Sequence, residues 1–109
     1  MEKQKKSGAI TICLVSDRAI RQLNLMYLAH NIATDVIAFD LSEKKNRIAD
    51  IAVSTDTAVR NAKAYNTTPL DELYLYVIHG LLHILGCKDN TALERVRMDT
   101  KAQRILATL

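Results

Sequence analysis

The hydrophobic pattern in the first half of the chain predicts three strands and one helix. Residues 9–15 (AITICLV) are β-branched and partly alternating, as in a strand. Ser16 is a predicted N-cap for a helix whose apolar positions recur at helical spacing. These positions are Ile20, Leu23, Tyr27 and Leu28. The β-rich runs 35–41 and 48–54 flank the polar segment 42–47, so they predict a hairpin.

The second half of the chain has helical patterns throughout. Ser54 or Thr55 begins a first helix. A second helix spans about 70–85, with Thr68 as its N-cap and Pro69 at the favoured first position. It is apolar almost all round, which is typical of a helix buried in the centre of a domain.

The ends of the last two helices are marked by specific residues. Gly86 is predicted to end the helix 70–85 by adopting a positive φ. Thr91 and Glu94 form a predicted capping box for a last helix that runs to about Ala107. The order strand, helix, strand, strand, helix, helix, helix predicts an α+β fold. We expect a small mixed sheet packed by helices around the central helix.

Composition and charge favour one domain over residues 1–109. Hydrophobic residues make up 49% and charged residues 25%, which is not the composition of a disordered chain. The net charge of +3 is compatible with an RNA partner but does not require one. Two cysteines, Cys13 and Cys87, do not make a disulfide framework. No apolar run reaches the roughly 20 residues of a membrane span. We therefore expect a cytoplasmic protein with reduced thiols and no membrane partner.

The segment 79–89 carries a pattern typical of a metal site. His79 and His83 are four residues apart, which places both imidazoles on one face of a helix. Gly86 lets the chain turn back, so that Asp89 can bring a carboxylate to the same ion. Two histidines and one carboxylate leave a fourth position open, which is the pattern of a catalytic Zn²⁺ site. The sequence predicts one Zn²⁺ per chain and a metal-bound water as the reacting group, with no protein catalytic residue identified.

Other residues could in principle belong to the metal site or change its chemistry, but different interpretations of them are favoured. Cys87 is a rival third ligand, although a small packed residue is the favoured interpretation. His30 is expected to be a surface residue at a helix end. A metallopeptidase is disfavoured, because Gly80 stands where the H-E-x-x-H motif has its general base. Glu72 lies two helical turns from His79, too far to replace that base.

Four blocks of sequence together resemble the YbeY family of bacterial ribosomal-RNA maturation factors. The strongest is 79–86 (HGLLHILG), where the family carries H-G-x-L-H-L-x-G and then a third ligand. The other three, in family order around it, are Leu23-Asn24-x-x-Tyr27 followed by the run 34–39 (TDVIAF), then the run 49–51 (ADI), and Met98 with Gln103.

The resemblance implies an α+β fold with the metal on the central helix. It also implies a zinc-dependent endoribonuclease that acts on single-stranded RNA. The expected roles are ribosomal-RNA maturation and ribosome quality control, with the ribosome or ribosomal proteins as partners. The chain departs from the family at two positions: Asp89 replaces the usual third histidine, and Leu28 replaces an arginine.

RNA binding is expected to depend on basic side chains that contact phosphates. The candidates are Lys44, Lys45, Arg47 and Lys88, although each is more often a solvated surface charge. The attacking group could be water or the 2′-hydroxyl of the RNA, and the sequence does not choose between them. Two alternatives stay open: a ribosome-assembly factor with little catalytic activity, suggested by Leu28, and a zinc ion that is purely structural.

Overall fold

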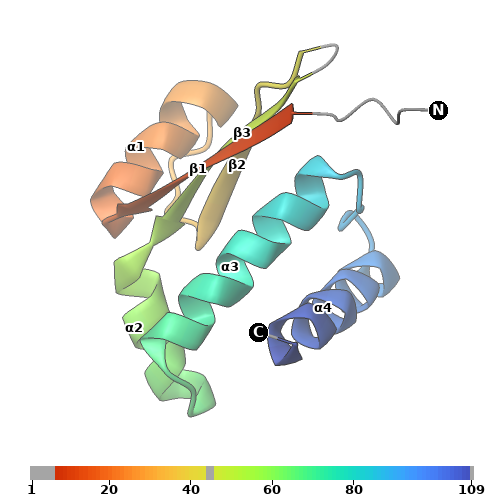
Figure 1. Cartoon of the computed structure of the whole chain (residues 1–109). Helices are drawn as coiled ribbons and strands as arrows, with labels where there is room; N and C mark the ends of the chain where they lie inside the picture. The colour runs from red at the N-terminus through yellow and green to blue at the C-terminus, as the bar shows by residue number, and fades with distance from the viewer. Residues whose placement is uncertain (1–6, 44–45, 109) are drawn as a thin grey trace, which may run out of the picture.

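The computed structural model describes residues 7–43 and 46–108. The elements follow one another in the predicted order (Figure 1). They are β1 (Ser7–Val15), α1 (Asp17–Leu28), β2 (Val36–Asp40), β3 (Asn46–Ser54), α2 (Thr55–Tyr65), α3 (Pro69–Ile84) and α4 (Ala92–Ala107). The predicted α+β class is confirmed.

The three strands form one mixed sheet in the order β1-β3-β2. β1 runs parallel to β3, with Ile12 opposite Ile51. β2 runs antiparallel to β3, with Ala38 opposite the same Ile51. The predicted hairpin is therefore confirmed, and β2 is left as an edge strand on the side away from β1.

Alternation along the strands separates the two faces of the sheet. One face carries Ile51 and Val53, which pack with Ala58 of α2 and Tyr76 of α3. On the opposite face, Ile37 and Ala52 pack against Ile20 of α1. A further cluster joins α3 to α4; it contains Ile78, Leu82, Met98 and Ala102. α3 thus lies between the sheet and α4, with α1 on the far face of the sheet (Figure 1).

Gly80 is the point where α3 comes closest to the sheet. A Cβ atom at this position would lie 3.2 Å from Cγ2 of Ile51, 3.3 Å from Cγ2 of Val36 and 3.5 Å from Cβ of Ala38. Two of these distances are shorter than ordinary van der Waals contacts between carbons. The close packing of α3 on β2 and β3 therefore favours a residue without a side chain and disfavours one as large as the glutamate of a metallopeptidase motif.

The helix ends agree with the predicted capping residues. The hydroxyl groups of Ser16, Ser54, Thr68 and Thr91 each accept a backbone N–H of the first turn of their helix. Thr91 and Glu94 form the complete capping box. Gly86 has φ of 98°, a conformation that glycine adopts at little cost. The chain therefore turns sharply after α3, as predicted.

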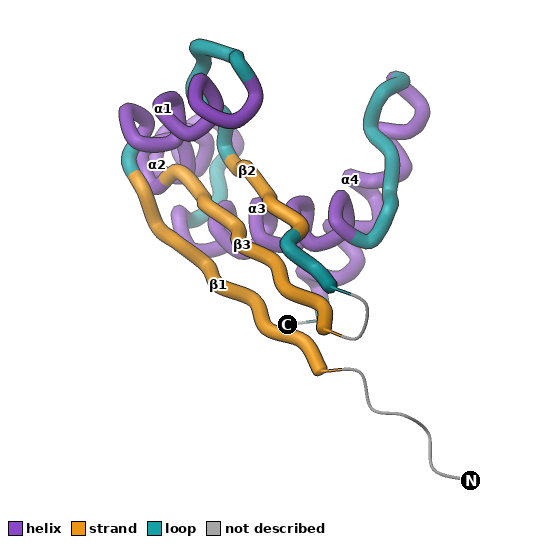
Figure 2. Tube along the Cα trace, turned by 90° about the horizontal axis from the view of Figure 1, so that it is seen from above, coloured by secondary structure: helices purple, strands orange, loops and turns teal. Residues whose placement is uncertain are grey.

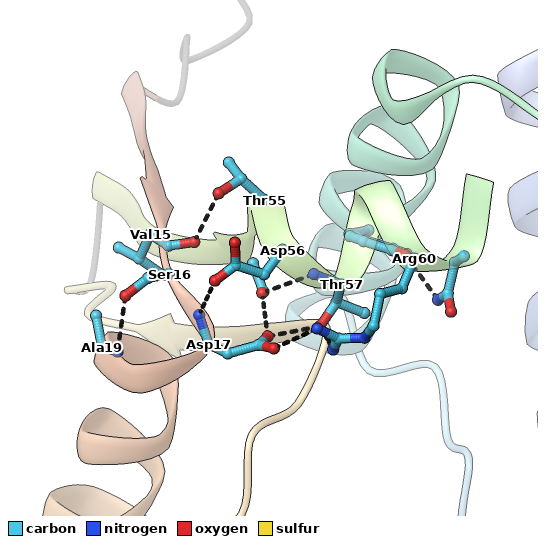
Figure 3. Close-up of polar contacts among 11 residues, drawn as sticks. Val15, Ser16, Asp17, Ala19, Thr55, Asp56, Thr57 and Arg60 are labelled. Carbon is cyan, nitrogen blue, oxygen red and sulfur yellow. Dashed lines mark hydrogen bonds and ion pairs between the residues drawn. The ribbon is translucent and has the colours of Figure 1, made fainter. Parts of the chain in front are cut away.

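A polar junction around Asp17 joins the beginnings of α1 and α2 to the end of β3 (Figure 3). Oδ1 of Asp17 accepts hydrogen bonds from Oγ of Ser54 at 2.6 Å and from Oγ1 of Thr57 at 2.9 Å. Its other carboxylate oxygen pairs with the guanidinium of Arg60. The bond to Arg60, supported by Ser54, lowers the pKa of Asp17 to about 2.

No helix within the described ranges has both the length and the apolar character needed to cross a membrane.

Candidate functional site

A cavity of about 650 Å³ opens along the β2 edge of the sheet. Its wall is built from α1 and the loop after it, from β2, from α3, and from α4 with the loop before it. β2 lies between α1 on one side and α4 on the other (Figure 2). Residues from distant parts of the sequence therefore meet in one cleft.

The two histidines of α3 both line this cavity. His79 is half-buried, with 24% of its side chain exposed, and His83 one turn later is exposed. Because Gly80 brings α3 close to β2, this face of the helix lies against the cavity floor. The structure thus places the predicted imidazole pair where both rings are accessible to a small ligand.

Asp89 reaches the same cavity from the loop between α3 and α4, where it is exposed. The three donors predicted for zinc therefore share one cleft, and their chemistry suits that ion. They do not form a coordination set as they stand: among the described residues, no three His, Cys, Asp or Glu side chains lie close enough to hold a metal. Zinc binding stays a prediction based on donor types and their shared location.

Asp99 is a cavity residue that the sequence analysis missed. It lies on α4, and its Oδ1 is 3.3 Å from Nε2 of His79. Carboxylates commonly orient a histidine that binds a metal through its other ring nitrogen. The sequence offers no local signal for this contact, because it depends on how α4 packs against α3.

The cavity has an excess of acidic groups. Asp35, Asp89 and Asp99 line it, whereas Arg95 is the only lysine or arginine in its wall among the described residues. Nη1 of Arg95 donates to the carbonyl oxygens of Asp89 and Asn90, both at 3.4 Å. A phosphate would be repelled from such a cleft unless a cation were bound there.

The basic residues proposed from the sequence lie elsewhere. Arg47, on β3, and Lys88, beside Asp89, are exposed and neither lines the cavity. Lys44 and Lys45 fall outside the described residues. Their role in RNA binding remains a prediction, and Arg95 is a candidate that the sequence analysis did not single out.

Asn24 fixes the loop that forms one wall of the cavity. It is buried, and its Nδ2 donates to the carbonyl of Ile32 at 3.1 Å and to Oγ1 of Thr34 at 2.9 Å. The backbone carbonyl of Asn24 accepts a hydrogen bond from the backbone N–H of His30 at 3.2 Å. His30 is exposed, as expected, but it also lines the cavity. The asparagine of the Leu23-Asn24-x-x-Tyr27 block therefore holds the loop after α1 in place.

Cys87 and Glu72 each make a contact that explains their position in the fold. Cys87 does not line the cavity, and it packs against the cluster shared by α3 and α4. Oε1 of Glu72 accepts a hydrogen bond from Oγ1 of Thr67 at 2.7 Å, a local contact near the start of α3. The position of Cys87 agrees with its favoured interpretation as a small packed residue, and Glu72 makes a local contact away from the cavity.

Fold and cavity together define an α+β domain with an imidazole-lined cleft at the edge of its sheet. The family model described as Endoribonuclease YbeY matches residues 1–109. The chain therefore belongs to the YbeY family, and the resemblance found in the sequence is confirmed.

Individual relatives agree with this assignment. The chain is 38% identical over 105 residues to Endoribonuclease YbeY of Parabacteroides distasonis, which covers 96% of this chain and 74% of that protein. It is 41% identical over 93 residues to Endoribonuclease YbeY of Cytophaga hutchinsonii, and this match covers 84% of this chain and 65% of that protein. The solution structure of TM1509 from Thermotoga maritima is similar in fold, with a TM-score of 0.58 and 29% identity over 89% of this chain and 67% of that one.

Proposed function

We propose that this chain is a zinc-dependent endoribonuclease that cleaves single-stranded RNA in ribosomal-RNA maturation and ribosome quality control. Membership of the YbeY family supports an RNA-cleaving role. The observation that carries the proposal is the shared cavity of His79, His83 and Asp89. We place the protein in the cytoplasm, where ribosomal RNA and ribosomal proteins would be its partners.

The charge of the cavity supports a bound cation. Asp35, Asp89 and Asp99 surround a site that has to accept the polyanionic backbone of RNA. Close to a protein surface, two unit charges about 4 Å apart interact by roughly 4 kcal/mol, so uncompensated carboxylates oppose a phosphate strongly. In our proposal His79, His83 and Asp89 hold one Zn²⁺. When bound, the ion would supply a Lewis acid that stabilises negative charge on the phosphoryl oxygens.

The protein's own groups bind and orient the substrate. The guanidinium of Arg95 has a planar donor pattern that matches two phosphate oxygens, so we assign it the contact to the scissile or neighbouring phosphate. Its hydrogen bonds to the carbonyls of Asp89 and Asn90 hold the side chain beside the loop that carries the third donor. Asp99 orients His79 through the contact between Oδ1 and Nε2. Lys88 and Arg47, both exposed outside the cavity, can extend the RNA path, and Lys44 and Lys45 remain candidates from the sequence.

Cleavage of a labelled single-stranded ribosomal-RNA fragment tests the proposal. His83→Ala, purified in the same way, is the matched control for contaminating ribonuclease. We expect the wild-type chain to cut, a chelator to stop it, added zinc to restore it, and His83→Ala to be inactive. Equal cutting by both proteins would refute the assignment. A 2′,3′-cyclic phosphate among the products would identify the 2′-hydroxyl as the attacking group.

An assembly factor with little catalytic activity is the second candidate. The observation that favours it is Leu28, which stands where the family carries an arginine and lines the cavity with an apolar, half-exposed side chain. This candidate predicts that His83→Ala still supports maturation of ribosomal RNA in cells. The nuclease proposal predicts that precursor RNA accumulates in the same cells.

A further inference from the structure

The cavity holds a third imidazole that the proposed zinc site does not use. His30 follows α1 and lines the cleft together with His79 and His83. The three rings come from two different walls, since His30 belongs to the loop between α1 and β2 and the others to α3.

Several hydrogen bonds hold the loop that carries His30. Ala29 adopts φ of 56°, a left-handed conformation that is less favourable for a residue with a Cβ atom than for glycine. The buried Asn24 bonds to the backbone of His30 and Ile32 and to the side chain of Thr34. Ala29 is the C-cap of α1, and a left-handed residue commonly ends a helix, so this conformation ends α1 and turns the chain toward the cavity. The backbone at His30 is therefore held at the wall of the cavity.

The chemistry of the cavity wall leaves one good proton donor. Cleavage at phosphorus releases an oxygen that needs a proton as its bond to phosphorus breaks. Asp35, Asp89 and Asp99 are carboxylates, which accept hydrogen bonds rather than donate them when ionised, and Arg95 does not give up its proton in proteins. Imidazole is the side chain most often used for this task. With His79 and His83 assigned to zinc, His30 is the remaining imidazole.

We propose that His30 is the general acid of RNA cleavage. The inference depends on the proposed nuclease function. The attacking oxygen forms a bond to phosphorus, and the bond between phosphorus and the leaving oxygen breaks. The leaving oxygen keeps that electron pair and takes a proton from the imidazolium of His30. The neutral imidazole then regains a proton from solvent, which has received the one lost by the attacking group.

A sulfur substitution in the substrate tests this role. The ends left by the wild-type chain identify the leaving oxygen, and a second RNA carries sulfur at that single position. A thiolate leaves without needing a proton. On normal RNA we expect His30→Gln to lower kcat by roughly 100-fold or more with little change in KM. On the sulfur-substituted RNA the variant should approach the wild-type rate.

Two controls separate this role from others. Asn31→Ala changes the next residue, which is exposed and does not line the cavity, and should leave both rates unchanged. Zinc content and melting temperature of His30→Gln should match those of the wild type. A variant that loses zinc would show that His30 is a ligand instead, which overturns the proposal.

The kinetic outcomes also distinguish this proposal from the proposed function. If the wild type cuts both RNAs and His30→Gln loses the same factor on each, only the general-acid role is wrong. If the wild type cuts neither RNA, the nuclease function itself is wrong, and the role of His30 is refuted with it.

Discussion

Nε2 of His79 on α3 lies 3.3 Å from Oδ1 of Asp99 on α4, and this contact joins two helices at the wall of the cavity. The side chain of Asp99 is 62% exposed, so the pair contributes little to stability as an isolated surface interaction. The contact instead orients the imidazole of His79, because a ring held on one side presents its other nitrogen in a defined direction.

Asp99→Asn should therefore weaken zinc binding more than folding. We expect the zinc affinity to fall by roughly tenfold, less than for His79→Ala, because a ligand is misoriented rather than lost. Competition with a chelating dye measures the affinity, and thermal unfolding of the metal-free chain provides the stability. Cys87→Ser, outside the cavity, should leave the affinity unchanged. An unaltered affinity in Asp99→Asn would contradict the orienting role.

Arg95→Gln should weaken RNA binding by removing a phosphate contact. Loss of one charge-assisted contact raises KM by roughly tenfold, and the slope of log affinity against log salt should fall in magnitude by about 0.7 for a single strand. The hydrogen bonds of Arg95 to the carbonyls of Asp89 and Asn90 are long, at 3.4 Å, so their loss should disturb the loop little. Arg97→Gln is the matched control on the same helix, because Arg97 is exposed and does not line the cavity. Equal KM values for the two variants would remove Arg95 from the RNA contact.

Asn24→Ala should destabilise the fold and loosen the His30 loop. The substitution removes two side-chain hydrogen bonds from a buried position, so we expect a loss of about 2 kcal/mol in the free energy of unfolding. Urea denaturation measures this loss. The exposed Asn31→Ala should stay within about 0.5 kcal/mol of the wild type. A similar stability for both variants would show that the loop does not depend on Asn24.

Gly80→Ala should also be destabilising, although alanine is the better helix former. Overpacking against Ile51 and Val36 costs about 1–3 kcal/mol, whereas the gain in helix propensity is at most about 1 kcal/mol. We expect a net loss of about 1 kcal/mol, and a larger loss for Gly80→Val. Chemical denaturation of the three proteins gives the order. A more stable Gly80→Ala would mean that the methyl groups of Ile51 and Val36 move aside easily.

Acid stability should depend on Asp17. Its pKa in the folded chain is about 2, below the ordinary value of 3.8, because Arg60, Ser54 and Thr57 favour the ionised form. The stabilisation is therefore complete above about pH 4 and is lost as the pH falls through the folded pKa. Asp17→Asn should be less stable by about 1–2 kcal/mol at neutral pH and should converge with the wild type near pH 2. Parallel loss of stability in both proteins between pH 4 and 2 would assign the acid effect to other carboxylates.

The sequence predicted the order of elements and the fold class because those signals are local. Ser16, Thr68, Gly86 and the capping box of Thr91 act within one helical turn, and strand alternation separates the two faces of the sheet. The helix pair His79 and His83 could be recognised for the same reason. Contacts that form only when helices and strands pack together have no such local signal in the sequence.

The residues missed by the sequence analysis are those that tertiary structure brings to the cavity. Asp99 and Arg95 reach it only because α4 packs against α3. His30, which the sequence identified only as a surface residue, lines the cavity because Asn24 holds the loop after α1. The glycine at position 80 was noticed for the glutamate it replaces. Glycine is favoured at this position because α3 approaches Ile51 closely, and the spacing of residues along the chain does not indicate that approach.

The parallel pairing of β1 with β3 has a consequence for the order of folding. Partners such as Ile12 and Ile51 lie far apart along the chain, with α1 and β2 between them. Closing so long a loop costs entropy before any ladder contact forms, whereas the hairpin of β2 with β3 and the neighbouring helices α2, α3 and α4 form from nearby residues. We therefore expect the wall of His79, His83 and Asp99 to assemble early and the docking of β1 to complete the sheet last.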